Sequence, residues 1–125
     1  MHKLLLALVL VLFACNPQAV EQIKLSSPDA RIEVIFQLEN GLPTYAVKVD
    51  DLDLIKPSRL GYRFRDQPDL MGPFDLIEYD QQVIDETWEP VWGQEKSIRS
   101  HSNLVTLHLV EQAKSGREVK LHFRV

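Results

Sequence analysis

Two tryptophans that lie four residues apart are the side chains of this sequence best suited to contacting a ligand. Trp88 and Trp92 belong to the run Asp85–Gly93 (DETWEPVWG), which contains both tryptophans of the chain. An indole presents a flat apolar face and one N–H donor, so a pair on a proline-stiffened segment can stack on the C–H faces of sugar rings. The same pair can also anchor a long loop onto a β-sandwich core. The residues alone leave both interpretations open.

Four carboxylates surround these tryptophans, and they are the groups that could perform acid–base chemistry. Glycoside hydrolysis uses two carboxylates held a fixed distance apart across a sugar ring. Closeness in the sequence does not bring such side chains to one point, so the cluster equally fits a solvated acidic loop. The four carboxylates are Asp85, Glu86, Glu89 and Glu95.

Other catalytic patterns are absent from the sequence. It contains no glycine-rich phosphate loop, no GxSxG elbow, no HExxH motif and no second cysteine. His101 lies in the polar run 100–103, directly after the tryptophan segment, where a loop position would allow a role in a site. His108 and His122 fall on outward positions of alternating runs, which predicts that both are solvated.

The N-terminus has the features of a bacterial lipoprotein signal peptide over residues 1–14. A short basic start precedes the apolar run Leu4–Phe13, which is too short to span a bilayer because spanning needs roughly 20 residues. The run Leu12–Cys15 (LFAC) resembles a lipobox. Lipidation also gives a reason for the single cysteine, Cys15, whereas an ordinary signal peptide would leave it incidental. We therefore expect export, a lipid anchor at the outer membrane or periplasmic face of a Gram-negative bacterium, and a tether over 15–22.

The charge of the chain argues against a nucleic-acid partner. Lysine and arginine number 14 and aspartate and glutamate number 18, which gives a formal net charge of −4. The charges are interspersed along the sequence and form no basic stripe. Proteins that bind nucleic acid need clustered positive charge to neutralise phosphates, and this sequence has no such cluster.

Alternation of apolar and polar residues predicts strands along most of the chain. The clearest runs are 32–39 with 45–49, and 105–109 with 119–125, and each pair predicts an antiparallel hairpin. The first hairpin turns at 40–43, in a loop longer than the two-residue minimum. No stretch sustains a helical period of 3.6 residues, which excludes a predominantly helical fold.

Weaker signals predict further extended segments between the two hairpins. An apolar run at 52–55 stops before Pro57, alternation resumes at 60–65, and extended structure returns at 74–79. Residues 66–73 are rich in Asp, Pro and Gly and predict a loop. Short strands separated by turn signals in this way favour an all-β fold, an antiparallel β-sandwich.

The sequence resembles the start of glycoside hydrolase family 97, the α-glucosidases and α-galactosidases of Bacteroidetes. The run D-E-T-W-x-P-V-W-G is highly specific for that family, and the other matching stretches follow in the same order. The matching stretches are Ser27–Asp29, Gly41–Tyr45, Pro57–Gly61, Asp85–Gly93, Ile98–Arg99 with His101 and Asn103, and Phe123–Val125.

The resemblance implies a larger enzyme. Family members have an N-terminal β-sandwich of the galactose-mutarotase-like super-sandwich type, a catalytic (β/α)₈ barrel and a C-terminal all-β domain. The catalytic carboxylates and most calcium ligands lie in the barrel. Residues 23–125 resemble only the first, incomplete part of the N-terminal domain, and Val125 falls in mid-alternation. We therefore expect no catalytic residue, metal site or cofactor in this chain, since the barrel fold alone takes roughly 250 residues.

The resemblance also implies which residues form a carbohydrate-binding site or an interface: Trp88, Trp92, Asp85, Arg99, His101 and Asn103. One stretch departs from the family, which commonly reads HYNEL where this chain has HSNLV at 101–105, so an aromatic residue and an acid are lacking there.

Two functions are consistent with these features. The first is a non-catalytic module that binds carbohydrate or packs on the catalytic domain of a hydrolase of α-linked glucosides or galactosides, with an α-linked oligosaccharide or the barrel as its partner. The alternative is a structural or interaction lipoprotein that binds no sugar and buries its tryptophans against a partner domain.

Overall fold

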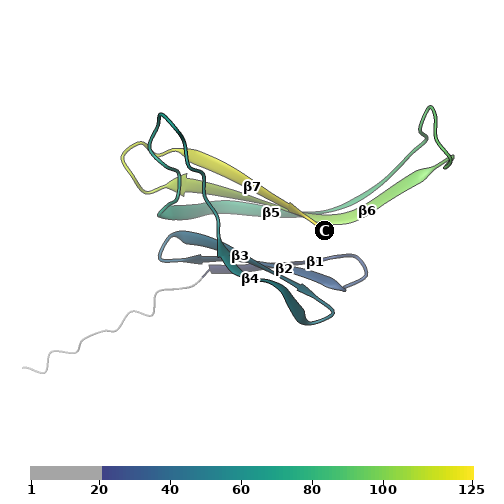
Figure 1. The fold of residues 1–125 in the computed structure, drawn as a ribbon, viewed down its shortest axis with the longest axis horizontal. Helices are drawn as coiled ribbons and strands as arrows, with labels where there is room; N and C mark the ends of the chain where they lie inside the picture. Colours follow the sequence, from purple (N-terminus) through teal and green to yellow (C-terminus); the bar gives the residue numbers. More distant parts are fainter. Residues whose placement is uncertain (1–20) are drawn as a thin grey trace, which may run out of the picture.

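The computed structural model describes residues 21–125, which form seven strands in two antiparallel sheets. The sheets face each other as two layers (Figure 1), so the predicted all-β antiparallel sandwich is confirmed. No helix in residues 21–125 is long and apolar enough to cross a membrane. The expected signal peptide (1–14), Cys15 and the tether up to residue 20 lie outside the described residues. The first described strand begins at Glu21, so the last two residues expected in the tether belong to that strand.

The first sheet is a four-stranded meander in which each strand pairs with the next along the chain. Its strands are β1 (Glu21–Ser26), β2 (Ile32–Glu39), β3 (Leu42–Val49) and β4 (Leu52–Arg59), in the order β1-β2-β3-β4. The β2–β3 hairpin is confirmed, but its predicted longer loop is wrong, because Glu39 pairs directly with Leu42. The turn is therefore Asn40-Gly41 alone. Both residues have positive φ (52° and 73°), which is what a tight two-residue hairpin turn requires.

The second sheet contains β5 (Phe74–Trp88), β6 (Ile98–Glu111) and β7 (Glu118–Arg124), in that order. The predicted β6–β7 hairpin is confirmed. Both β5 and β6 are longer than the sequence indicated, because β5 continues beyond residue 79 and β6 begins well before 105. The added halves pair with each other through the register Trp88↔Ile98 and carry mostly exposed side chains. One-sided burial, which produces the alternating sequence signal, is therefore missing there.

Two further predictions fail between β3 and β5. The strand expected to stop before Pro57 runs through it to Arg59. A proline is tolerated there because β4 is an edge strand, where one side of the backbone makes no ladder bonds. The strand expected at 60–65 does not form, and only the isolated bridge between Tyr62 and Leu70 remains. Tyr62 and Phe64 are exposed, so their alternation does not reflect a buried face.

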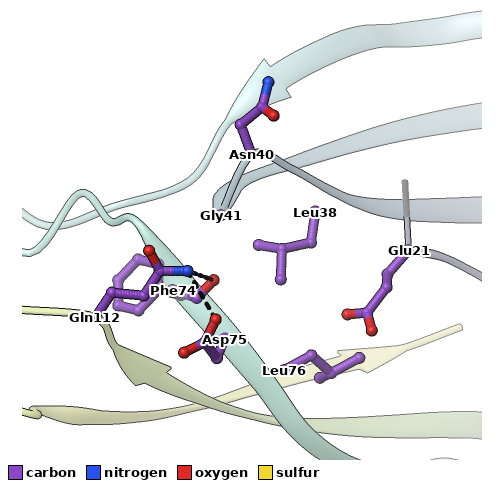
Figure 2. Close-up of a pocket in the computed structure, with 8 residues that line it drawn as sticks. All are labelled: Glu21, Leu38, Asn40, Gly41, Phe74, Asp75, Leu76 and Gln112. Atoms are coloured by element: carbon purple, nitrogen blue, oxygen red, sulfur yellow. Dashed lines mark hydrogen bonds between the residues drawn. The ribbon is translucent and has the colours of Figure 1, made fainter. Parts of the chain in front are cut away.

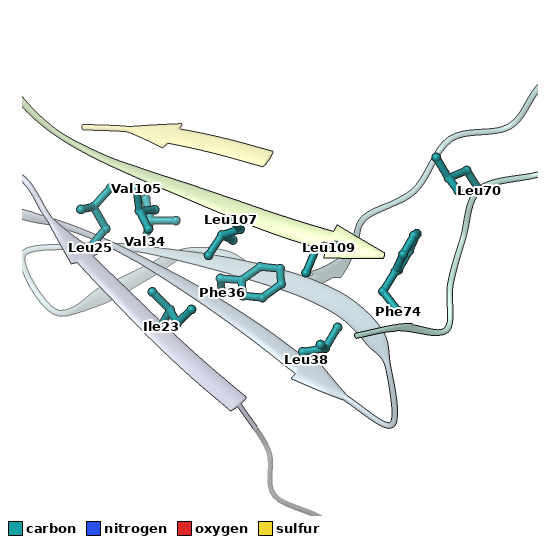
Figure 3. Close-up of a cluster of buried hydrophobic side chains, with 10 residues drawn as sticks. All are labelled: Ile23, Leu25, Val34, Phe36, Leu38, Leu70, Phe74, Val105, Leu107 and Leu109. Carbon is teal, nitrogen blue, oxygen red and sulfur yellow. The ribbon is translucent and has the colours of Figure 1, made fainter. Parts of the chain in front are cut away.

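The core lies between β2 and β6. Phe36 of β2 is almost fully buried and lies against Leu107 and Leu109 of β6 (Figure 3). The ring of Phe123 from β7 closes the layer, with its centroid 6.3 Å from that of Phe36. The buried apolar residues are Ile23, Leu25, Val34, Phe36, Leu38, Leu70, Phe74, Val105, Leu107 and Leu109. Burial of each large side chain stabilises the fold by about 1.5–3 kcal/mol.

The connection between the two sheets, residues 60–73, is fixed by an ion pair at the β6–β7 turn. Arg117 donates to both carboxylate oxygens of Glu111 at 2.8 Å. Two further N–H groups of the guanidinium donate to the backbone carbonyls of Pro68 and Asp69, each at 2.8 Å. Hydrogen bonds from Arg117 and then Ser115 lower the pKa of Glu111 to about 2, so the carboxylate stays ionised down to that pH. We call Glu111, Arg117 and the two carbonyls the clamp.

Replacement of Leu107 by alanine should lower the free energy of unfolding by about 2–5 kcal/mol, because the side chain is fully buried and would leave a cavity. Urea unfolding followed by circular dichroism measures this. Val83→Ala is the matched control, since Val83 is 70% exposed and its truncation should change stability by less than about 0.5 kcal/mol. Equal losses for the two variants would contradict the described core.

Candidate functional site

The far half of the β5–β6 hairpin extends beyond the sandwich. In Figure 1 the pair curves away from the four-stranded sheet and ends in the green loop at the upper right. The near half of β6 carries the buried residues Val105, Leu107 and Leu109, whereas residues 85–99 are almost all exposed. This hairpin therefore places the tryptophan segment away from the core.

Both tryptophans point to solvent in this chain. Trp88 is the last residue of β5 and is 47% exposed, and Trp92, in the loop between β5 and β6, is 88% exposed. Val91 between them is 99% exposed, and Ile98, which pairs with Trp88, is 37% exposed. The interpretation that the tryptophans anchor the loop onto the sandwich core is therefore wrong. We call Trp88, Val91, Trp92 and Ile98 the tip patch.

The predicted site residues divide between the two faces of the hairpin. Paired residues share a face, and faces alternate along each strand. Asp85 pairs with His101, which puts them on one face with Arg99 and Asn103. Trp88 pairs with Ile98 and lies on the opposite face. The strands thus bring the four polar residues together and separate them from Trp88, while Trp92 lies beyond both strands.

Asp85 and Arg99 form a two-pronged ion pair on the polar face. The guanidinium donates to the two carboxylate oxygens at 2.7 and 2.6 Å. These bonds are the main reason that the pKa of Asp85 is lowered, and nearby His101 adds a smaller electrostatic contribution. The carboxyl is therefore ionised near neutral pH and cannot serve as a general acid. Its charge is already matched, so this pair has a positioning role across the hairpin.

Asn103 also has a structural role in this chain. Its side-chain amide donates to the backbone carbonyl of Ser26 at 2.7 Å, and its own backbone pairs with Val125 at 2.7 and 2.9 Å. Asn103 thus ties β6 to the end of β1, at the point where the hairpin leaves the sandwich. His101 is exposed and lies within β6, so the expectation of a loop position for this histidine is wrong.

The acidic residues of the tryptophan segment do not converge. Glu86 pairs with Ser100 on the face opposite Asp85, and Glu89 and Glu95 lie in the exposed loop. Within residues 21–125, no group of three or more His, Cys, Asp or Glu side chains could hold a metal ion.

The sequence interpretation missed Val91 and Ile98. The available signal for Val91 was its place in the sequence, because it is an apolar residue between two tryptophans in a loop. Ile98 gave no signal, because its place beside Trp88 depends on the register of the extended hairpin. Ile98 shares the face of Trp88 at the end of the hairpin, and Val91 lies with Trp92 in the adjoining loop.

A separate cavity of about 360 Å³ lies where the two sheets meet (Figure 2). The β2–β3 turn packs on the start of β5 there, and the Phe74 amide donates to the Gly41 carbonyl at 2.7 Å. The Gln112 side chain donates to Asp75 at 2.7 Å. None of the predicted site residues lies in this cavity, whose lining is Glu21, Leu38, Asn40, Gly41, Phe74, Asp75, Leu76 and Gln112.

Comparison with known proteins gives one family. The family model described as glycosyl-hydrolase 97 N-terminal matches residues 25–125. Two similar solved structures are of a glycoside hydrolase family 97 enzyme from Pseudoalteromonas sp. strain K8, in complex with panose and with acarbose. Each is 24% identical with a TM-score of 0.75. A β-arabinopyranosidase structure is 20% identical with a TM-score of 0.70 and is covered over 16% of its length. This chain is covered over 82% in all three and spans 15% of the Pseudoalteromonas enzyme.

Proposed function

The chain belongs to the glycosyl-hydrolase 97 N-terminal family, and from that membership we propose that it is a non-catalytic module that packs onto the catalytic part of a glycoside hydrolase. The observation that carries this proposal is the tip patch, in which Val91 is 99% and Trp92 88% exposed. Exposed apolar side chains gathered in one short segment mark an interaction site, and tryptophans dominate the energetics of protein interfaces.

The surroundings of the tip patch favour a protein partner over a sugar. A sugar site combines an aromatic face with polar groups that receive the hydroxyls. Two of the predicted polar residues, Asp85 and Arg99, bond to each other on the other face of the hairpin. The tip patch itself joins two indoles to Val91 and Ile98, which is the aromatic and aliphatic composition of a buried interface centre.

Carbohydrate binding at the tip is the second candidate. The Trp92 indole is open to solvent, and the similar Pseudoalteromonas enzyme is in complex with panose and acarbose. By this proposal the parent enzyme acts on α-linked glucosides or galactosides, and Trp92 lines the entrance to its active site. The partners are then the catalytic domain and the sugar held between the two.

We also propose that the module is exported and lipid-anchored through Cys15, on the strength of the signal-like N-terminus. The two-acyl anchor of a lipoprotein gives stable membrane attachment, whereas one acyl chain gives only marginal binding. Cys15→Ser should move the protein from the membrane fraction to the soluble fraction of an expressing Gram-negative cell. A wild-type chain found only in the soluble fraction would rule the anchor out.

Packing through the tip patch is tested in a chimera. In the chimera, residues 21–125 replace the matching segment of the Pseudoalteromonas enzyme. A second version of the chimera carries the substitutions Trp88→Ala and Trp92→Ala. Loss of interface tryptophans costs about 2 kcal/mol or more. The chimera with the alanine substitutions should therefore unfold at a lower temperature in calorimetry than the chimera without them. Tyr79→Ala is the control, since Tyr79 is exposed on β5 outside the tip patch. An unchanged unfolding temperature for the tryptophan variant would contradict the packing role.

Tryptophan emission of the full chain distinguishes the two candidates. The exposed indoles should emit at long wavelength, and panose or melibiose should leave the spectrum unchanged if the tip contacts protein. Quenching that saturates with sugar and disappears in Trp92→Ala would instead establish the carbohydrate site. Glycerol at the same concentration controls for effects of the solvent.

A further inference from the structure

We propose that the β4–β5 connection carries a carbohydrate-stacking surface formed by Tyr62 and Phe64, separate from the tip patch. No part of the proposed packing role uses this segment. The ligand class is a neutral chain of pyranose sugars.

The two rings lie nearly parallel to each other, and both residues are partly exposed. Their centroids are 6.4 Å apart and their planes are 20° from parallel. Tyr62 is 54% and Phe64 43% exposed, although aromatic residues of small domains usually bury most of their surface. The ring surface that stays exposed in this pair is the kind of apolar surface on which the C–H faces of sugar rings stack.

The backbone that carries the rings is held in place. Tyr62 and Leu70 exchange backbone hydrogen bonds of 2.9 and 2.8 Å, and the Phe64 amide donates to the Asp69 carboxylate at 3.3 Å. Leu70 is buried in the core, so this bridge connects the ring pair to the body of the sandwich.

The clamp fixes the same segment from the other side. Arg117 donates to the carbonyls of Pro68 and Asp69 while Glu111 holds its guanidinium. A binding surface that is ordered before the ligand arrives avoids the entropy loss of ordering a loop on binding. The exposed rings are thus held in place before any ligand binds. A loop that only connects two sheets does not need such a fixed conformation.

The surroundings of the ring pair favour a sugar over a protein. Both rings are followed directly by arginines, Arg63 and Arg65, and among the described residues neither arginine forms a salt bridge. Asp66 and Gln67 add exposed acceptors and donors. Charges of both signs around a small apolar surface suit a neutral ligand with many hydroxyls. A protein interface needs a larger apolar centre from which charged residues are depleted.

The position of the ring pair allows both surfaces to be used together. Figure 1 shows the β4–β5 connection at the end of the molecule opposite to the loop between β5 and β6. Packing through the tip patch would therefore leave Tyr62 and Phe64 uncovered by the same contact. A sugar chain bound there would keep an attached enzyme near its polymeric substrate.

Isothermal titration of the full chain tests the proposal, in a non-ionic detergent without a sugar headgroup. The probes are maltoheptaose and cellohexaose, titrated separately. We expect at least one to bind, with a Kd on the order of 1 mM or tighter. Tyr62→Leu with Phe64→Leu should weaken that binding at least about tenfold, because leucine keeps the apolar bulk and removes the rings.

Three controls make the result specific. Circular dichroism and the thermal midpoint test whether the double leucine variant is folded. If the double variant does not fold, the single substitution Phe64→Leu is used in its place. Tyr79→Ala removes an exposed tyrosine elsewhere and should leave binding unchanged. Trp88→Ala with Trp92→Ala should also leave it unchanged, which separates this surface from the tip patch. No binding of either probe by the folded chain, or equal binding by the leucine variant, would overturn the proposal.

Discussion

The packing of β2 against β6 is the contact on which the rest of the structure depends. Phe36 lies against Leu107 and Leu109, and this layer joins two sheets that share no strand. The connection from β4 to β5 must cross from one sheet to the other, and the clamp holds it to the β6–β7 turn. The extended hairpin then begins where β6 leaves the core. Both exposed surfaces are therefore positioned by one apolar contact.

The extended hairpin keeps its form with little burial to support it. Its backbone ladder runs without interruption from Tyr79 to Trp88, and the Asp85–Arg99 pair reinforces it on one face. Exposed ion pairs contribute little to global stability, but a two-pronged pair limits how the strands can slide. Asn103 anchors the base of the hairpin to β1. The result is an apolar tip held at a defined distance from the sandwich.

The sequence predicted those elements whose residues have one buried and one solvated face. Val34, Phe36 and Leu38 alternate with polar residues because the core takes only one side of β2, and the same holds for Val105, Leu107 and Leu109. The far halves of β5 and β6 escaped prediction because neither of their faces is lined by buried apolar side chains. Tyr62 and Phe64 produced a strand signal without a strand, because their alternation belongs to an exposed surface. The family was recognisable from Asp85–Gly93, yet the division of its residues between two faces depends on strand register, which no local pattern gives.

The two faces of the far hairpin can be altered by mutation separately from each other. Asp85 and Arg99 point to one side and Trp88 to the other, so a substitution on one face need not disturb the packing of the other. Residues without shared partners usually make additive contributions. A single short ribbon can in this way carry two surfaces that mutation changes independently.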